Sequence, residues 1–96
     1  MGNINMRQKP VQSRDVAFQT MQPDTVLLNL ETGYYYSINS LGAEIWRQCD
    51  GETEIAAIID NLRQKYDVSP DQLTEDLVDF INQMLKEGLL KVNNHD

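Results

Sequence analysis

The sequence predicts a single α+β domain, in which a three-stranded antiparallel sheet is followed by three helices. Three observations lead to this fold class. Apolar and polar residues alternate from Asp15 to Ile38, a spacing of 3.6 residues replaces the alternation from Asn39 onward, and glycines mark the boundaries between segments. The 96 residues, of which 41% are hydrophobic, suffice for one domain with a modest core of two packed layers.

The first two strands follow from period-two patterns. Val16, Phe18 and Thr20 share one face of the first strand, which a turn at Pro23 and Asp24 ends. In the second strand, Val26, Leu28 and Leu30 share a face. We expect this face of the second strand to be the buried one.

A hairpin joins the second strand to three consecutive tyrosines. Gly33 can adopt a positive φ cheaply, so Glu31–Gly33 is expected to form a three-residue loop with a bulge. The resulting register pairs Leu30 with Tyr34, Leu28 with Tyr36, and Val26 with Ile38. It places Tyr34 and Tyr36 on the buried face, and Tyr35 and Ser37 on the reverse.

Capping residues delimit the helices. The first is expected from a cap at Asn39 or Ser40 to about Cys49, and the second from a cap near Thr53. In the third, Ser69 caps, Pro70 occupies the first helical position and Gln72 completes a capping box; Gly88 ends the helix after Glu87. Residues 89–92 could add a short strand. The apolar stripes of the three helices are Leu41, Ile45 and Trp46; Ile55, Ile58, Ile59 and Leu62; and Leu73, Leu77, Val78, Phe80, Ile81, Met84 and Leu85.

The charge and the few reactive side chains exclude several classes of function. A net charge of −7 repels nucleic acids and anionic membranes. Cys49 is the only cysteine, and the only histidine, His95, lies in the C-terminal tail, so we predict neither a nucleophilic pair nor a metal or cofactor site. The chain is therefore not expected to be an enzyme. Without a signal peptide or an apolar run of about 18 residues, it is expected in the cytoplasm.

The third helix allows two interpretations. Its apolar arc is wider than the stripe of about 100° that a surface helix needs. Either all seven apolar residues are core, or the margin at Leu77, Phe80 and Met84 lines a groove for a partner. A winged helix-turn-helix protein that binds DNA is an alternative, but the outward residues of this helix, including Glu75 and Asp79, are mostly acidic and would repel phosphates.

The order of these segments resembles a known family. The segments that show the resemblance are "VLLNLETGYYYSINSLGAEIW" (26–46), "DG" (50–51), "IAAIIDNLRQKYDV" (55–68) and "DLVDFINQMLKEGLL" (76–90). Together they are similar to the PqqD-like proteins, also called RiPP recognition elements. The resemblance covers about residues 16–92 and implies a winged helix-turn-helix-like fold without catalytic activity.

The resemblance also implies a function. Such proteins bind the leader segment of a ribosomally made precursor peptide as an added strand, and deliver the peptide to a radical SAM enzyme, a leader peptidase or a cyclase. The hairpin "LETGYYYSIN" is more similar to elements of lasso-peptide and related clusters than to PqqD of pyrroloquinoline quinone synthesis, which is kept as the alternative. The peptide-binding residues implied are Tyr34, Tyr35, Tyr36, Ser37, Ile38, Leu73, Asp76, Leu77, Phe80 and Met84.

Residues 1–13 carry no period and are predicted to be a flexible arm, before a domain at 14–92 and a polar tail at 93–96. A free edge strand would permit a weak dimer but does not require one, so a monomer or a weak dimer is expected.

Overall fold

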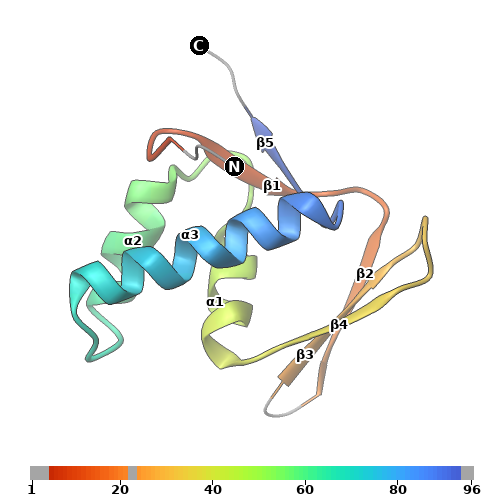
Figure 1. Cartoon of the computed structure of the whole chain (residues 1–96), viewed down its shortest axis with the longest axis horizontal. Coiled ribbons are helices and arrows are strands. Elements are labelled where there is room, and N and C mark those ends of the chain that lie inside the picture. Colours follow the sequence, from red (N-terminus) through yellow and green to blue (C-terminus); the bar gives the residue numbers. More distant parts are fainter. Residues whose placement is uncertain (1–4, 22–23, 94–96) are drawn as a thin grey trace.

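The computed structural model describes residues 5–21 and 24–93 (Figure 1). It confirms the predicted α+β class: β2, β3 and β4 form an antiparallel sheet in that order, and three helices follow. The elements are β1 (Lys9–Gln12), β2 (Val16–Met21), β3 (Asp24–Asn29), β4 (Tyr35–Ile38), α1 (Ser40–Gln48), α2 (Ile55–Arg63), α3 (Pro70–Lys86) and β5 (Leu90–Asn93). The predicted turn at Pro23 and the histidine His95 lie outside the described residues.

The prediction of a flexible arm is wrong for residues 9–12, which form β1. This strand pairs antiparallel with β5 in a second sheet, in the register Pro10 opposite Val92. Its other side is held by backbone bonds from Gln12 N–H to Cys49 O and from Gly51 N–H to Pro10 O. The ordered domain therefore starts before residue 14, and Asn93 belongs to β5 instead of the tail.

The hairpin register differs from the prediction by one residue. Leu28 lies opposite Tyr35, Leu27 opposite Tyr36, and Thr25 opposite Ile38. A shift of one residue moves a whole strand face to the other side of the sheet. The buried face of β3 is consequently Thr25, Leu27 and Asn29, while Val26 and Leu28 are only half-buried and Leu30 is exposed.

Asn29 is the physical reason for this register. Its Oδ1 accepts the backbone N–H groups of Glu31 and Thr32, and its Nδ2 donates to Glu87 O at the end of α3. A buried amide with these partners lengthens the loop to Leu30–Gly33, closed by bonds between Asn29 and residues 33 and 34. Gly33 has φ +81, as the prediction required of the loop glycine.

Most of the predicted caps are present. Asn39 Oδ1 accepts Gly42 N–H at the start of α1, and Ser69 Oγ accepts Gln72 N–H at the start of α3. The capping box is incomplete, because the Gln72 side chain donates to Asp76. Thr53 is not the cap of α2; Glu54 holds that position without a side-chain bond, and Thr53 bonds Asp50.

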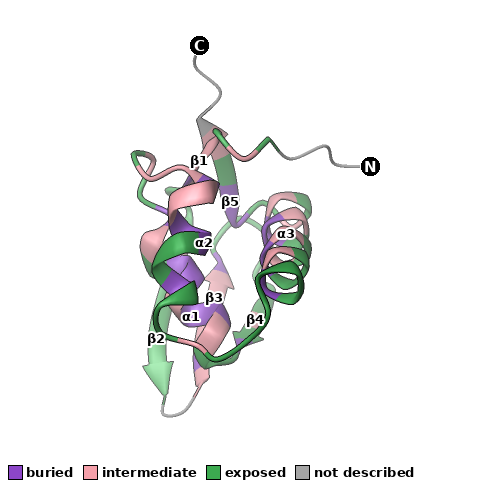
Figure 2. Ribbon diagram, turned by 90° about the vertical axis from the view of Figure 1, so that its left-hand side faces the viewer, coloured by how far each residue is buried: buried purple, intermediate pink, exposed green. Residues whose placement is uncertain are grey.

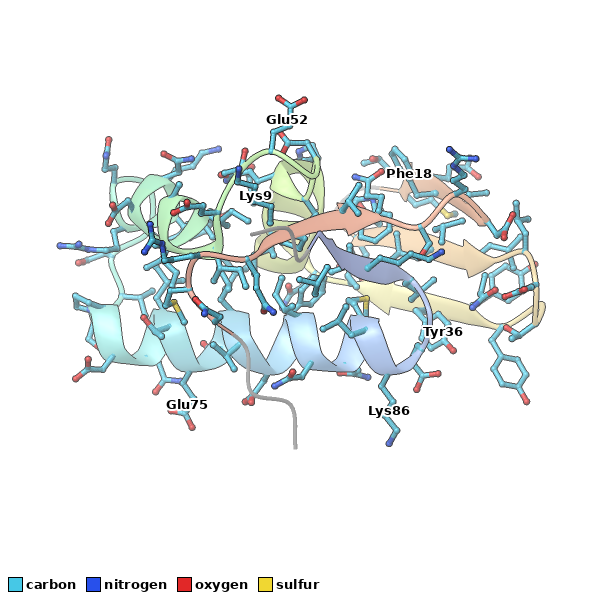
Figure 3. The ribbon with its side chains drawn as sticks, turned by 90° about the horizontal axis from the view of Figure 1, so that it is seen from above. Lys9, Phe18, Tyr36, Glu52, Glu75 and Lys86 are labelled. Atoms are coloured by element: carbon cyan, nitrogen blue, oxygen red, sulfur yellow. The ribbon has the colours of Figure 1, made fainter. Side chains whose placement is uncertain are left out.

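The core lies where α1 meets α2, α3 and the strands β3 and β4 (Figure 2). Trp46 is 1% exposed and meets the ring of Phe18 edge-on, with 6.1 Å between centroids. On α3, charged side chains such as Glu75 and Lys86 point away from the other elements (Figure 3). The buried side chains of α3 are Leu73, Leu77, Ile81 and Met84, whereas Val78, Phe80 and Leu85 are partly buried.

Candidate functional site: an open strand edge beside a groove

Strand β4 is an edge strand of its sheet. Among the described strands it pairs only with β3. The bond from Asn29 N–H to Tyr34 O marks residues 29 and 34 as a hydrogen-bonded pair. Because such pairs alternate along an antiparallel ladder, the N–H and C=O groups of Tyr35 and Ser37 point to the open side. This edge can accept the main chain of another strand.

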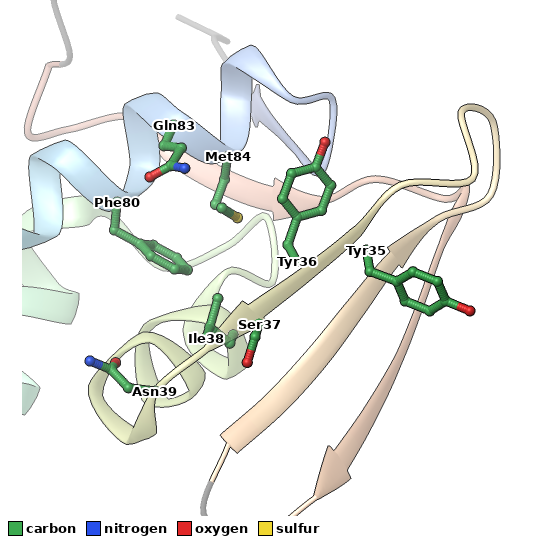
Figure 4. Close-up of a pocket in the computed structure, with 8 residues that line it drawn as sticks. All are labelled: Tyr35, Tyr36, Ser37, Ile38, Asn39, Phe80, Gln83 and Met84. Atoms are coloured by element: carbon green, nitrogen blue, oxygen red, sulfur yellow. The ribbon is translucent and has the colours of Figure 1, made fainter.

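A groove of about 450 Å³ runs between β4 and α3. Figure 4 shows Phe80 and Met84 pointing from α3 toward the strand, while Tyr36 points from the strand toward the helix. Ile38 and Met84, which are 7% and 3% exposed, form the apolar floor. The lining residues are Tyr35, Tyr36, Ser37, Ile38, Asn39, Phe80, Gln83 and Met84.

Tyr36 closes one end of the groove. Its hydroxyl donates a 2.7 Å hydrogen bond to Glu87 Oε1, beyond the last turn of α3. This bond to a carboxylate raises the pKa of the Tyr36 phenol, and partial burial and the charge of Glu87 act in the same direction. The phenol is therefore protonated at neutral pH and donates the hydrogen bond that links β4 to the end of α3.

A second hollow, of about 190 Å³, continues from the groove past the start of α1. It shares Asn39 and Phe80 with the groove and adds side chains from α1 and one carboxylate from α3. The residues that it adds are Leu41, Gly42, Ile45 and Asp76. Gly42 lets α1 and α3 approach closely, since a Cβ there would lie 3.1 Å from Phe80 Cε1.

The structure brings together most of the predicted peptide-binding residues. Tyr35, Tyr36, Ser37, Ile38, Phe80 and Met84 line the groove, and Asp76 lines the second hollow.

Three of the predicted residues lie elsewhere. Leu73 and Leu77 are fully buried, which makes them core instead of groove wall. Tyr34 was predicted to be buried beside Tyr36, but it is 64% exposed at the hairpin end and lines neither hollow. The open margin of α3 is thus Asp76, Phe80, Gln83 and Met84.

Sequence reasoning missed Asn39 and Gln83 as lining residues. Gln83 follows Phe80 by one helical turn, so the spacing of three residues already placed it on that margin. Asn39 was interpreted only as a helix cap; its position directly after β4 puts it at the end of the groove as well.

The single cysteine, Cys49, lies in the core and does not line the groove. Cys49 is 1% exposed, and burial raises the pKa of its thiol to about 12, so the thiolate nucleophile does not form near neutral pH. No group of metal-binding side chains is present within residues 5–21 and 24–93. In the same part of the chain, no helix is long and apolar enough to cross a membrane.

The match to a family of known proteins agrees with this geometry. Residues 24–90 match the family of coenzyme PQQ synthesis protein D (PqqD). No curated protein matches the sequence significantly.

Two solved structures have a similar fold. One is TbiB1 in complex with the TbiA(beta) leader peptide, with 26% identity and a TM-score of 0.77 over 90% of this chain and 98% of that one. The other is a lasso peptide synthetase B1 complexed with the leader peptide, with 17% identity and a TM-score of 0.77 over 86% and 98% of the two chains. Because the family match spans more than half of the sequence, the chain belongs to the PqqD family, as its resemblance to PqqD-like proteins predicted.

Proposed function

We propose that this protein binds the leader segment of a ribosomally synthesised precursor peptide and delivers it to a modifying enzyme, without catalysing a reaction itself. The observation that carries the proposal is the open edge of β4 beside the groove between β4 and α3. The leader adds as a further strand to β4, and its alternate side chains enter the groove toward α3.

The composition of β4 supports this role. An exposed edge strand usually carries a charge or a proline that prevents unwanted pairing. Tyr35, Tyr36, Ser37 and Ile38 supply neither, although the chain is rich in charge elsewhere. The edge of β4 has no residue that prevents pairing, and it lies beside the groove of about 450 Å³, so it is suited to pairing with a specific strand.

The comparison with TbiB1 favours a leader peptide as the ligand, and the resemblance of the hairpin at residues 30–39 favours a lasso-peptide-type or related pathway. That protein shares 26% of its aligned residues with this chain and is seen with a leader peptide. We propose the same class of ligand here, with a leader peptidase, a cyclase or a radical SAM enzyme as the cytoplasmic recipient. A role as PqqD in pyrroloquinoline quinone synthesis is the alternative that the family match keeps open.

Nuclear magnetic resonance can test the binding site. ¹⁵N-labelled protein is titrated with synthetic leader peptides encoded by short genes beside its own gene. We expect the amide signals of residues 35–39 and 80–84 to shift, and those of α2 and β5 to remain in place. Saturable binding that shifts α2 instead of β4 would refute strand addition at this edge.

A further inference from the structure

We propose that the second hollow receives a lysine or arginine side chain of the bound leader, held by the carboxylate of Asp76. The inference rests on the proposed function and adds a chemical requirement for the peptide. The hollow of about 190 Å³ combines the apolar side chains of Leu41, Ile45 and Phe80 with a single ionised group. Long cationic side chains match such a lining, because they bury a methylene stem while the charged end stays near water.

Asp76 is placed to meet the charged end. It lies on the exposed part of α3 that borders the hollow, so a cation that it binds keeps part of its hydration. Its Oδ1 accepts a 2.9 Å hydrogen bond from Gln72 Nε2, one turn earlier, which restrains the carboxylate. None of the ion pairs among the described residues involves Asp76. Its charge is therefore available to a ligand.

The surrounding charges favour a cation over other ligand groups. Glu75 and Asp79 are exposed on the same part of α3, while Lys86 lies at its opposite end. Asp76 is the one charged residue that lines the hollow. Glu75 and Asp79 do not line it and add a weaker negative potential, since salt screens exposed charges. Arg47 and Lys65 are already paired with Glu44 on α1. An acidic leader residue would be repelled by the negative charge at this hollow. A neutral apolar residue would make no electrostatic interaction with Asp76.

The two hollows also fix the spacing. They share Phe80 and Asn39 as a common wall, so we expect successive side chains on one face of the added strand to enter them. Side chains on one face of a strand alternate with those on the other, and successive ones on the same face are about 6.6–6.8 Å apart. The basic residue should therefore lie two positions from the apolar or aromatic residue that fills the groove.

Phage display can test this requirement without a known leader. A library of random 12-residue peptides is selected against the wild-type protein, against Asp76→Lys, and against Asp79→Lys. The Asp79→Lys control makes the same charge change one helical turn away, outside both hollows. Circular dichroism confirms that each variant is folded.

We expect wild-type and Asp79→Lys selections to enrich lysine or arginine two positions from an apolar residue. The Asp76→Lys selection should lose this preference and favour aspartate or glutamate at that position. For an enriched basic peptide, Asp76→Asn should weaken binding about 1.5- to 5-fold at low salt, the range of an exposed ion pair, and less at high salt.

The failures of the two proposals are distinguishable. Enriched peptides without a basic preference, or with the same preference in the Asp76→Lys selection, would overturn the cation subsite while leaving strand addition intact. Peptides that bind equally well to wild type and to Ser37→Pro, which blocks the strand edge, would contradict the proposed function itself.

Discussion

The hydroxyl of Tyr36 lies 2.7 Å from Glu87 Oε1 and donates a hydrogen bond that joins the edge strand to the end of α3. The backbone carbonyl of the same glutamate accepts a 2.9 Å bond from Asn29 Nδ2 on β3. Glu87, the residue that follows α3, thus binds both strands of the hairpin, β3 and β4. Because β4 and α3 are the two walls of the groove, these bonds set its width at this end.

The Tyr36 bond should make stability depend on alkaline pH. The folded-state pKa of the phenol is raised above its ordinary value of 10.0, so its contribution is complete below that value and is lost as the pH rises through the raised pKa. Urea unfolding from pH 7 to 11 should show wild type more stable than Tyr36→Phe near neutrality, with the difference decreasing as the pH rises above 10.0. Tyr35→Phe, at a residue 72% exposed, should behave as wild type. A constant difference at every pH would contradict this explanation.

Replacing Asn29 should cost more stability than replacing an exposed asparagine. Asn29 is 3% exposed, and its side chain satisfies two loop N–H groups and the Glu87 carbonyl. Asn29→Ala should therefore lower the free energy of unfolding by about 1–3 kcal/mol, measured by urea denaturation. Asn61→Ala removes an exposed bond to Gln48 and should change it by less than about 0.5 kcal/mol. Equal effects of the two substitutions would argue against Asn29 as the determinant of the hairpin.

Gly42→Ala should impair peptide binding through Phe80. The new Cβ would lie 3.1 Å from Phe80 Cε1 and 3.2 Å from Ile38 Cβ, so the ring must move within the groove. Overpacking typically costs about 1–3 kcal/mol, which the higher helix propensity of alanine offsets by about 1 kcal/mol. We expect a small loss of stability and weaker binding in a fluorescence anisotropy titration of a leader or selected peptide.

A second substitution can identify Phe80 as the cause. In the double variant Gly42→Ala, Phe80→Leu the shorter side chain leaves room for the new methyl group, so the two changes should not be additive. Additive effects on stability and binding would show that the contact between the two residues is unimportant.

Local chemistry made the helices predictable. Asn39 and Ser69 accept the N–H groups that helix starts leave unpaired, and those signals are contained in a few neighbouring residues. The tertiary contacts were harder to predict. Asn29 looks like a polar residue at the end of an apolar strand, and its burial depends on Glu87, 58 residues away in the chain. That contact determines the register of β3 and β4. The alternation of apolar and polar residues alone predicted a register that is wrong by one residue.

The missed strand and the misplaced groove wall have similar causes. Residues 9–12 show no alternation that marks a strand, and they form β1 because they pair with β5, which lies far away in the sequence. Pro10 is fully buried there. The wide apolar arc of α3 left two interpretations open, an all-core helix and a helix with one margin at a groove. Which margin is open depends on where β4 lies, and that position assigns Leu73 and Leu77 to the core and Phe80 to the groove.

The central claim is that main-chain bonds at the edge of β4 hold the peptide, and a comparison of two substitutions at Ser37 tests it most directly. Ser37 is exposed, pairs with Val26, and turns its N–H to the open side, so neither alanine nor proline there removes a ladder donor. Proline does remove the donor that an added strand needs, and its ring crowds the edge.

The dissociation constants of a leader peptide are measured by isothermal titration calorimetry for wild type, Ser37→Ala and Ser37→Pro, after circular dichroism confirms that all three are folded. We predict that Ser37→Ala binds as wild type does, and that Ser37→Pro binds about tenfold more weakly or worse, the equivalent of about 1.4 kcal/mol or more. Equal affinities of the folded proline and alanine variants would contradict strand addition at β4.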